Sequence, residues 1–250
     1  IFFRALPQRG PTRLKKIRNL SYYDMKVCLV SDYLAEYHEK WSGAEMVVKI
    51  LAELLLKENQ DVFFFTTRFF KKTTSDKIYQ IPVLTSRGGL LKKILIPFYL
   101  FWGIIFSIYY LNKVKPEVIN FLHTNYLFLP VMLAAKILRL PTVFTFLDYY
   151  MLCDRATFLL SSGQICDQLE GKICLRCISK IKLVERYFIR QLRKKINGII
   201  TFTETSKQRL IRHGFPPEKI RVIYTYTMPE EFKGKSKEKK LNSVFVTAFF

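Results

Sequence analysis

The stretch that decides the fold is residues 25–58, which opens with MKVCLVSDY (25–33) and closes with GAEMVVKILAELLLKE (43–58). Its first part places a short apolar run at 27–31, which is typical of a buried parallel strand. Its second part repeats apolar residues at helical spacing, from Met46 to Leu55. A strand, a loop and an amphipathic helix in this order predict the first unit of an alternating α/β domain.

The same alternation continues along the chain. Further strands are expected at 62–66, 118–122, 142–146, 199–203 and 220–224, and further helices at 127–138, 178–196 and 204–213. Strands that alternate with helices predict a Rossmann-like α/β fold, a parallel sheet with helices on both faces.

Outside this domain, which we expect to cover 25–228, the composition changes. Residues 1–24 hold six basic residues and read as a basic tail, either a solvated arm or the product of upstream translation. Residues 229–243 are rich in charge and lack apolar periodicity, which predicts a linker. The apolar run at 244–250 would then open a second domain, so we expect the chain to be a fragment of a longer protein.

Composition restricts the class of protein. Half of the 250 residues are hydrophobic, which excludes intrinsic disorder, and five cysteines are too few for a disulfide scaffold. The formal net charge of +21 indicates an anionic partner such as a membrane surface or a phosphorylated substrate. We expect no nucleic-acid partner, because no recognised binding motif occurs and the aromatic residues lie in apolar runs.

One uncharged segment, residues 94–111, departs from the α/β pattern. It lies where a crossover helix of the sheet is due, and that is the favoured interpretation. Its aromatic residues and flanking lysines also suit a helix in a membrane interface. A transmembrane span is the third interpretation, but it would place strands of one sheet on opposite sides of a bilayer.

Motifs for ligand chemistry are few. The sequence has no P-loop, no G-x-G-x-x-G after the first strand and no D-x-D. It does have a turn of small residues, Ser42, Gly43 and Ala44, at the start of the helix at 43–58. Free backbone N–H groups at a helix start favour a phosphate. The alternative is helix capping by Ser42, with Glu45 as the capping-box partner.

Several segments together resemble one family. The run MKVCLVSDY…WSGAE resembles the start of retaining family-4 glycosyltransferases of the two-domain GT-B fold, whose GGAE-like turn stands here as SGAE. KPEVINFLHTNY (115–126) resembles the family's P-D-V-I-H-x-H segment, LPTVFTFLDYYMLC (140–153) its next strand and loop, and 196–226 its closing strand–helix–strand. The resemblance covers most of 25–228 in the right order.

The resemblance implies a fold, an activity and a site. The N-terminal domain of such enzymes binds the acceptor, and the second domain binds the nucleotide-sugar donor. Ser42, Gly43 and Ala44 would line the cleft near the donor phosphates, and His123, Asp148 and Glu204 would lie at strand ends that face the acceptor. The family often has His-Asp where this chain has Leu147-Asp148, so the role of that histidine is lost or passes to Asp148 or Tyr149.

Four cysteines cluster between a strand and a helix: Cys153, Cys166, Cys174 and Cys177. Their C-x-x-C and two further thiols suit a structural zinc ion, and the resemblance includes a subgroup with a Cys-rich insertion here. Free reduced thiols are the alternative. No catalytic metal is expected.

The basic residues from Lys172 to Lys195 fit a protein that rests on an anionic leaflet, or a solvated helix face. The resemblance implies a glycosyltransferase fragment that, when complete, moves a sugar with retention from a nucleotide-sugar to a glycan or lipid-linked acceptor. We expect it in the cytoplasm, peripheral on the inner face of the membrane. The alternative is a non-catalytic glycan- or membrane-binding module that lacks the donor domain.

Overall fold

The computed structural model describes residues 24–35, 37–38, 43–68, 75–82, 90–160, 162–166, 174, 177–178 and 180–224. The expected linker and second-domain start, and nearly all of the expected basic tail, lie outside these residues, as does Ser42.

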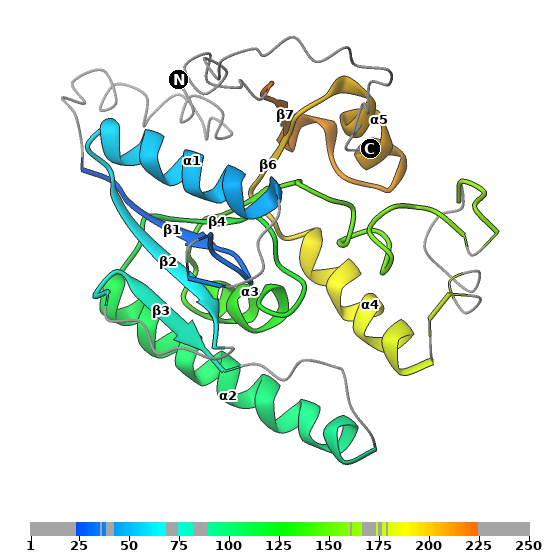
Figure 1. Cartoon of the computed structure of the whole chain (residues 1–250), viewed down its shortest axis with the longest axis horizontal. Helices are drawn as coiled ribbons and strands as arrows, with labels where there is room; N and C mark the ends of the chain where they lie inside the picture. The colour runs from blue at the N-terminus through cyan, green and yellow to red at the C-terminus, as the bar shows by residue number, and fades with distance from the viewer. Residues whose placement is uncertain are drawn as a thin grey trace, which may run out of the picture.

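A seven-stranded parallel sheet forms the centre of the molecule (Figure 1). Its strands follow the order β3-β2-β1-β4-β5-β6-β7 and every pair is parallel. The strands are β1 (Lys26–Val30), β2 (Asp61–Thr67), β3 (Ile78–Ile81), β4 (Val118–Phe121), β5 (Thr142–Thr145), β6 (Gly198–Thr201) and β7 (Ile220–Val222). The predicted parallel α/β fold is therefore confirmed.

Five α-helices alternate with the strands in the described part of the chain. They are α1 (Gly43–Lys57), α2 (Leu90–Val114), α3 (Phe128–Ile137), α4 (Lys180–Arg193) and α5 (Glu204–Arg212). Alternate side chains of each strand point to opposite faces of the sheet. Val27 and Leu29 of β1 thus pack with Val48 of α1, whereas Cys28 and Val30 pack in the larger core with α2 and α3.

Helix α2 occupies the segment for which the sequence left three interpretations. It runs from the edge strand β3 back to the central strand β4 and packs closely on α3, so the crossover interpretation is confirmed. Gly103 makes this approach close, because a Cβ atom built there would lie 3.2 Å from the Cβ of Pro130. Within the part of the chain that the structure describes, no helix combines the length and apolar character needed to cross a bilayer.

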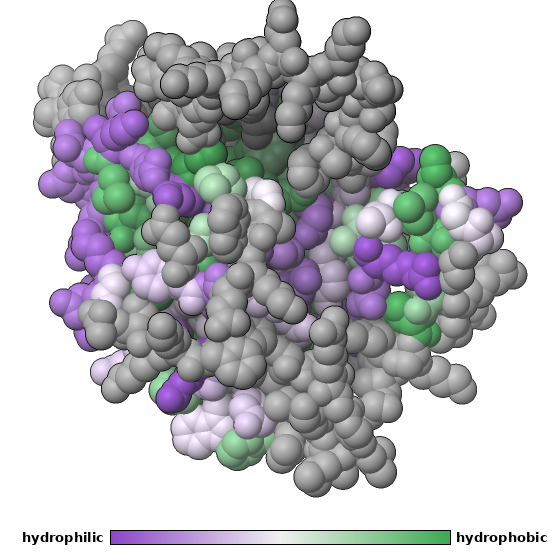
Figure 2. Space-filling model, in the orientation of Figure 1, coloured by the Kyte–Doolittle hydropathy of each residue, from purple (hydrophilic) through white to green (hydrophobic). Residues whose placement is uncertain are grey.

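The opposite face of the sheet carries α1, whose own outer side is mixed in character. Hydrophobic side chains appear between hydrophilic ones over this helix at the upper left of Figure 2. On α1, the side chains of Leu54 and Leu56 are both substantially exposed. The inner side of α1 buries Val48, Ala52 and Leu55 against the sheet.

The strand order reverses direction between β1 and β4. From β1 the chain moves outward to β2 and β3, and after α2 it returns to add β4 to β7 on the other side of β1. In open α/β sheets, ligands bind outside the carboxyl ends of the strands at such a switch point. The loops after β1 and β4 are therefore where a site is expected.

Candidate functional site at the switch between β1 and β4

Asp32 ties together the loops that follow β1 and β4. Its backbone N–H donates to the carbonyl oxygen of His123 at 2.8 Å. Its carboxylate accepts backbone hydrogen bonds from the three residues that lead into α3, namely Asn125, Tyr126 and Leu127. Asp32 is completely buried, and burial raises the pKa of its carboxyl group to about 6 even though these N–H groups and His123 oppose the shift.

His123 lies between two carboxylates from different parts of the chain. Its Nδ1 is 3.0 Å from Oε1 of Glu45, in the first turn of α1, and its Nε2 is 3.4 Å from Oδ2 of Asp148, in the loop after β5. The Glu45 side chain is 3% exposed, against 18% for His123 and 33% for Asp148. The imidazole is thus held from the inside by Glu45 and meets Asp148 on the more open side.

The charges around His123 favour its protonated form. Burial of the ring acts to lower its pKa, but the hydrogen bond with Glu45 and the negative charges of Asp148, Asp32 and Glu45 outweigh it, so the pKa is raised above its usual value. When protonated, both ring nitrogens donate, which suits a carboxylate at each. The site can therefore present a positively charged imidazolium beside a partly exposed carboxylate.

Two buried polar atoms lie next to His123 in the chain. Within the described residues, the hydroxyl of Thr124 and the side-chain oxygen of Asn125 have no hydrogen-bond partner. Buried polar atoms are normally paired, so unpaired ones at this position are available to a ligand.

The structure brings together some of the predicted site residues and not others. His123 and Asp148 meet, as described above. Glu204 instead lies at the start of α5, after β6, and its side chain is exposed. Its Oε2 is 3.5 Å from Nζ of Lys207, three residues further along the helix. Gly43 and Ala44 form the start of α1, the helix that supplies Glu45. Tyr149, the other residue considered for the role of the family histidine, has a buried ring, and its hydroxyl oxygen lies 2.8 Å from that of Ser206.

Sequence reasoning missed two residues of the site. Glu45 was considered only as a capping partner, and its carboxylate contacts His123. Asp32 was not among the predicted site residues. The signal for Asp32 was its position directly after a buried strand, where a charged residue must find partners or a ligand.

The four clustered cysteines do not form a metal centre. Among the described residues, which include all four, no group of three or more His, Cys, Asp and Glu side chains is arranged to hold a metal ion. All four are free thiols and partly buried, and Cys153 and Cys166 pack against the main core. The structure therefore does not support the structural zinc interpretation.

Fold and site together define a Rossmann-like domain with a charged site at its switch point, and comparison with known proteins gives the family. The family model for Glycosyltransferase Family 4 matches residues 41–227, so the chain belongs to this family. No curated protein matches the sequence significantly.

The solved structures that the chain resembles share little sequence with it. Sucrose-phosphate synthase from Thermosynechococcus elongatus matches with 15% identity and a TM-score of 0.50, over 81% of this chain and 48% of that one. UDP-GlcNAc 2-epimerase from Methanocaldococcus jannaschii matches with 15% identity and a TM-score of 0.49, over 80% and 45%. MurG from Acinetobacter baumannii matches with 12% identity and a TM-score of 0.45, over 82% and 46%. The chain spans less than half the length of each.

The architecture is that of the N-terminal half of a GT-B fold. The similarity to sucrose-phosphate synthase shows this fold alone, since the identity is low. What the site does must be argued from its residues.

Proposed function

We propose that this chain is the acceptor-binding half of a retaining glycosyltransferase, which moves a sugar from a nucleotide-sugar to a glycan or lipid-linked acceptor. The family supports glycosyl transfer in general. The observation that carries the proposal is the His123 imidazole held between Glu45 and Asp148 at the switch point of the sheet. The donor-binding half would come from a second domain.

The chemistry of the site suits this reaction. Transfer from a nucleotide-sugar develops negative charge on the leaving diphosphate, and a fixed cation stabilises such charge. The protonated His123 would supply it, helped by the positive end of α1, which begins at Gly43 and Ala44. Asp148 would accept a hydrogen bond from the acceptor hydroxyl. Glu204 would contact the acceptor further along the edge of the sheet, two strands away from β4.

An exposed aromatic face on α2 supports a membrane location. Five large apolar side chains lie along it at helical spacing, each more than a third exposed: Phe98, Phe101, Trp102, Ile105 and Tyr109. Tyrosine and tryptophan favour membrane interfaces, and the net charge of +21 favours an anionic leaflet. We propose that this face rests on the inner, cytoplasmic leaflet, where a lipid-linked acceptor would be found.

The membrane proposal is tested by co-sedimentation with vesicles of phosphatidylcholine and phosphatidylglycerol. The double variant Phe98→Ser and Phe101→Ser should lower the bound fraction severalfold, because each removes an exposed apolar side chain. The control is Leu54→Ser with Leu56→Ser, which removes exposed apolar groups from α1 instead. Equal loss in both variants, or binding by neither the wild type nor the variants, would reject α2 as the membrane face.

The transferase proposal is tested on the full-length gene product with radiolabelled nucleotide-sugars and a membrane lipid extract. His123→Gln and Asp148→Asn should each reduce transfer by about 100-fold, in the range reported for single electrostatic groups. Asp61 is the first residue of β2, at the opposite edge of the sheet from the site, and its carboxylate forms a surface ion pair with Lys77. Asp61→Asn should therefore leave transfer unchanged. The anomeric configuration of the product tests retention. Wild-type activity in His123→Gln would contradict the proposed role of His123 in transfer.

Leu147 favours a second candidate, a glycan- or membrane-binding module without catalysis. The side chain at the position of the family histidine packs against the α1-side core, so it serves the fold rather than a ligand. Saturable binding of a glycan or lipid by the full-length product, with no transfer or hydrolysis of any nucleotide-sugar, would establish this candidate.

A further inference from the structure

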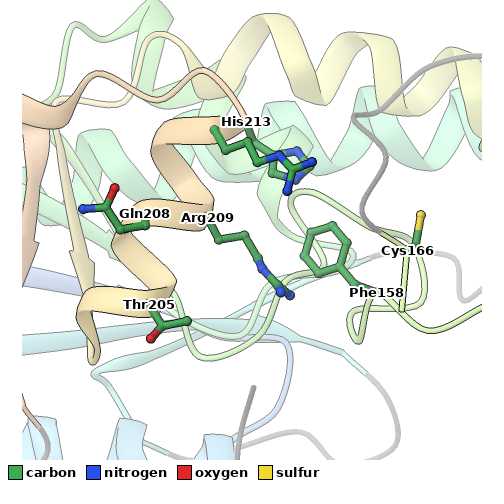
Figure 3. A pocket seen from close by; sticks show the side chains of 7 residues that line it. Phe158, Cys166, Thr205, Gln208, Arg209 and His213 are labelled. Atoms are coloured by element: carbon green, nitrogen blue, oxygen red, sulfur yellow. The ribbon is translucent and has the colours of Figure 1, made fainter. Parts of the chain in front are cut away.

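A pocket of about 210 Å³ lies between α5 and the loop that follows β5. Its lining comes from the two sides, as Figure 3 shows: α5 contributes Thr205, Gln208 and Arg209, and the loop contributes Phe158 and Cys166. Arg212 and His213 complete it at the end of α5. None of the seven described residues that line it is acidic.

Arg209 is held in a fixed orientation across this pocket. Its guanidinium carbon lies 4.9 Å from the centre of the Phe158 ring and 5.4 Å from that of Tyr149. In Figure 3 the side chain extends from α5 toward Phe158. Contact with two aromatic faces leaves the N–H groups at the rim of the guanidinium available, and no ion pair of Arg209 occurs within the described residues. A planar donor group fixed in this way suits a bidentate oxyanion.

The surroundings of the pocket are strongly positive. Burial and the charges of four arginines lower the pKa of His213 to about 4; in order of effect these are Arg193, Arg212, Arg209 and Arg190. The framework is rigid on this side, since buried Arg193 donates to the carbonyl oxygens of Met151 and His213. Because His213 is neutral near pH 7, the positive electrostatic potential of the pocket comes from the arginines. The neutral ring still has one N–H group to donate.

We propose that this pocket binds the phosphate group of a ligand, with Arg209 as the main donor and Arg212, Gln208 and Thr205 around it. The pocket far exceeds the ~15 Å³ that one water needs, so an ion of phosphate size fits. The proposal does not depend on sugar transfer. The phosphate could belong to a soluble compound or to a lipid headgroup, which use the same donors.

The soluble arm of the test is isothermal titration of the full-length chain with inorganic phosphate and with pyrophosphate. We expect saturable binding that Arg209→Gln weakens at least tenfold, as is usual for a charge-assisted hydrogen bond. Arg209→Lys keeps the charge but loses the planar fork, so it should restore only part of the affinity. Arg221→Gln is the matched control, because this arginine is exposed on β7 outside the pocket, and it should change affinity less than about twofold.

The lipid arm uses phosphatidylcholine vesicles with and without phosphatidic acid. A loss of phosphatidic-acid-dependent binding in Arg209→Gln, but not in Arg221→Gln, would assign the pocket to a lipid phosphate. A loss of pyrophosphate binding alone would assign it to a soluble ligand. Circular dichroism and thermal unfolding of each variant show that it is folded. No saturable binding by the wild type in either arm, or equal losses in the Arg209 and Arg221 variants, would overturn the proposal.

Discussion

His123 takes its charge state from residues that are far apart in the sequence. Glu45 comes from the start of α1 and Asp148 from the loop after β5, and each contacts a different ring nitrogen. The hydrogen bond with Glu45 is the largest of the effects that raise the pKa of His123. The buried Glu45 is thus the residue that does most to raise the pKa of His123.

Replacement of Glu45 by Gln should lower the pKa of His123, because the variant lacks both the negative charge and the carboxylate acceptor. An NMR pH titration of the His123 ring protons measures the shift. Glu53→Gln, an exposed position on the same helix, should leave this pKa in place. An unchanged pKa in Glu45→Gln would contradict the assignment of Glu45 as the controlling residue.

Asp32 should contribute strongly to stability, because three backbone N–H groups depend on its two carboxylate oxygens. Asp32→Asn replaces one of these acceptors with an NH₂ group that faces a donor. We expect the free energy of unfolding at pH 7 to fall by about 2 kcal/mol or more, as for a buried charged hydrogen-bond group. Asp61→Asn, which breaks an exposed pair with Lys77, should cost less than about 1 kcal/mol. Equal losses in urea unfolding would be evidence against the role of Asp32.

At the scale of elements, the packing of α2 on α3 depends on a residue without a side chain. Gly103→Leu would insert a side chain where even a Cβ atom meets Pro130 at 3.2 Å. We expect a loss of about 1–3 kcal/mol in the free energy of unfolding, since overpacking of a closed interface has this magnitude. Asn112→Leu adds the same side chain at an exposed position of α2 and should change stability by less than about 0.5 kcal/mol. A stable Gly103→Leu variant would mean that α2 can shift on α3.

Most elements could be predicted from the sequence because their burial leaves a pattern. The apolar run at 27–31 corresponds to β1 (Lys26–Val30), and the helical spacing after Gly43 to α1. The edge strand β3 (Ile78–Ile81) was missed, since its sequence IYQI lacks the continuous apolar run that marks a strand buried on both faces. The site was predicted in part: the position after a strand pointed to His123, but the contact with Glu45 depends on how α1 lies on the sheet. Local sequence does not encode that arrangement.

At the scale of the whole molecule, stability should decline on the acid side because of His213. The pKa of this histidine falls from 6.5 to about 4 in the folded state, so the unfolded state binds the proton first. Its contribution is complete above pH 6.5 and is lost as the pH falls toward 4. Asp32 acts in the opposite direction, since its raised pKa of about 6 makes the folded state bind a proton before the unfolded state does.

The comparison of wild type with His213→Gln isolates this effect, because Asp32 is common to both proteins. The difference in free energy of unfolding, wild type minus variant, should decrease between pH 6.5 and pH 4. Urea unfolding at several pH values measures it. Parallel pH profiles for the two proteins would show that His213 does not titrate as proposed.

The strand order also determines when the domain can fold during its synthesis. β1 leaves the ribosome first, yet it is an inner strand, with Val27 opposite Val62 on one side and Val118 on the other. Strands β1 to β3 can pair before β4 has been synthesised, because β4 follows the long helix α2. Until then, one edge of β1 has no partner strand. Pairing across such a sequence separation is slow, and an uncovered strand edge is open to other chains. We therefore expect the nascent protein to pass through a stage in which one edge of the inner strand β1 is open to pairing with other chains.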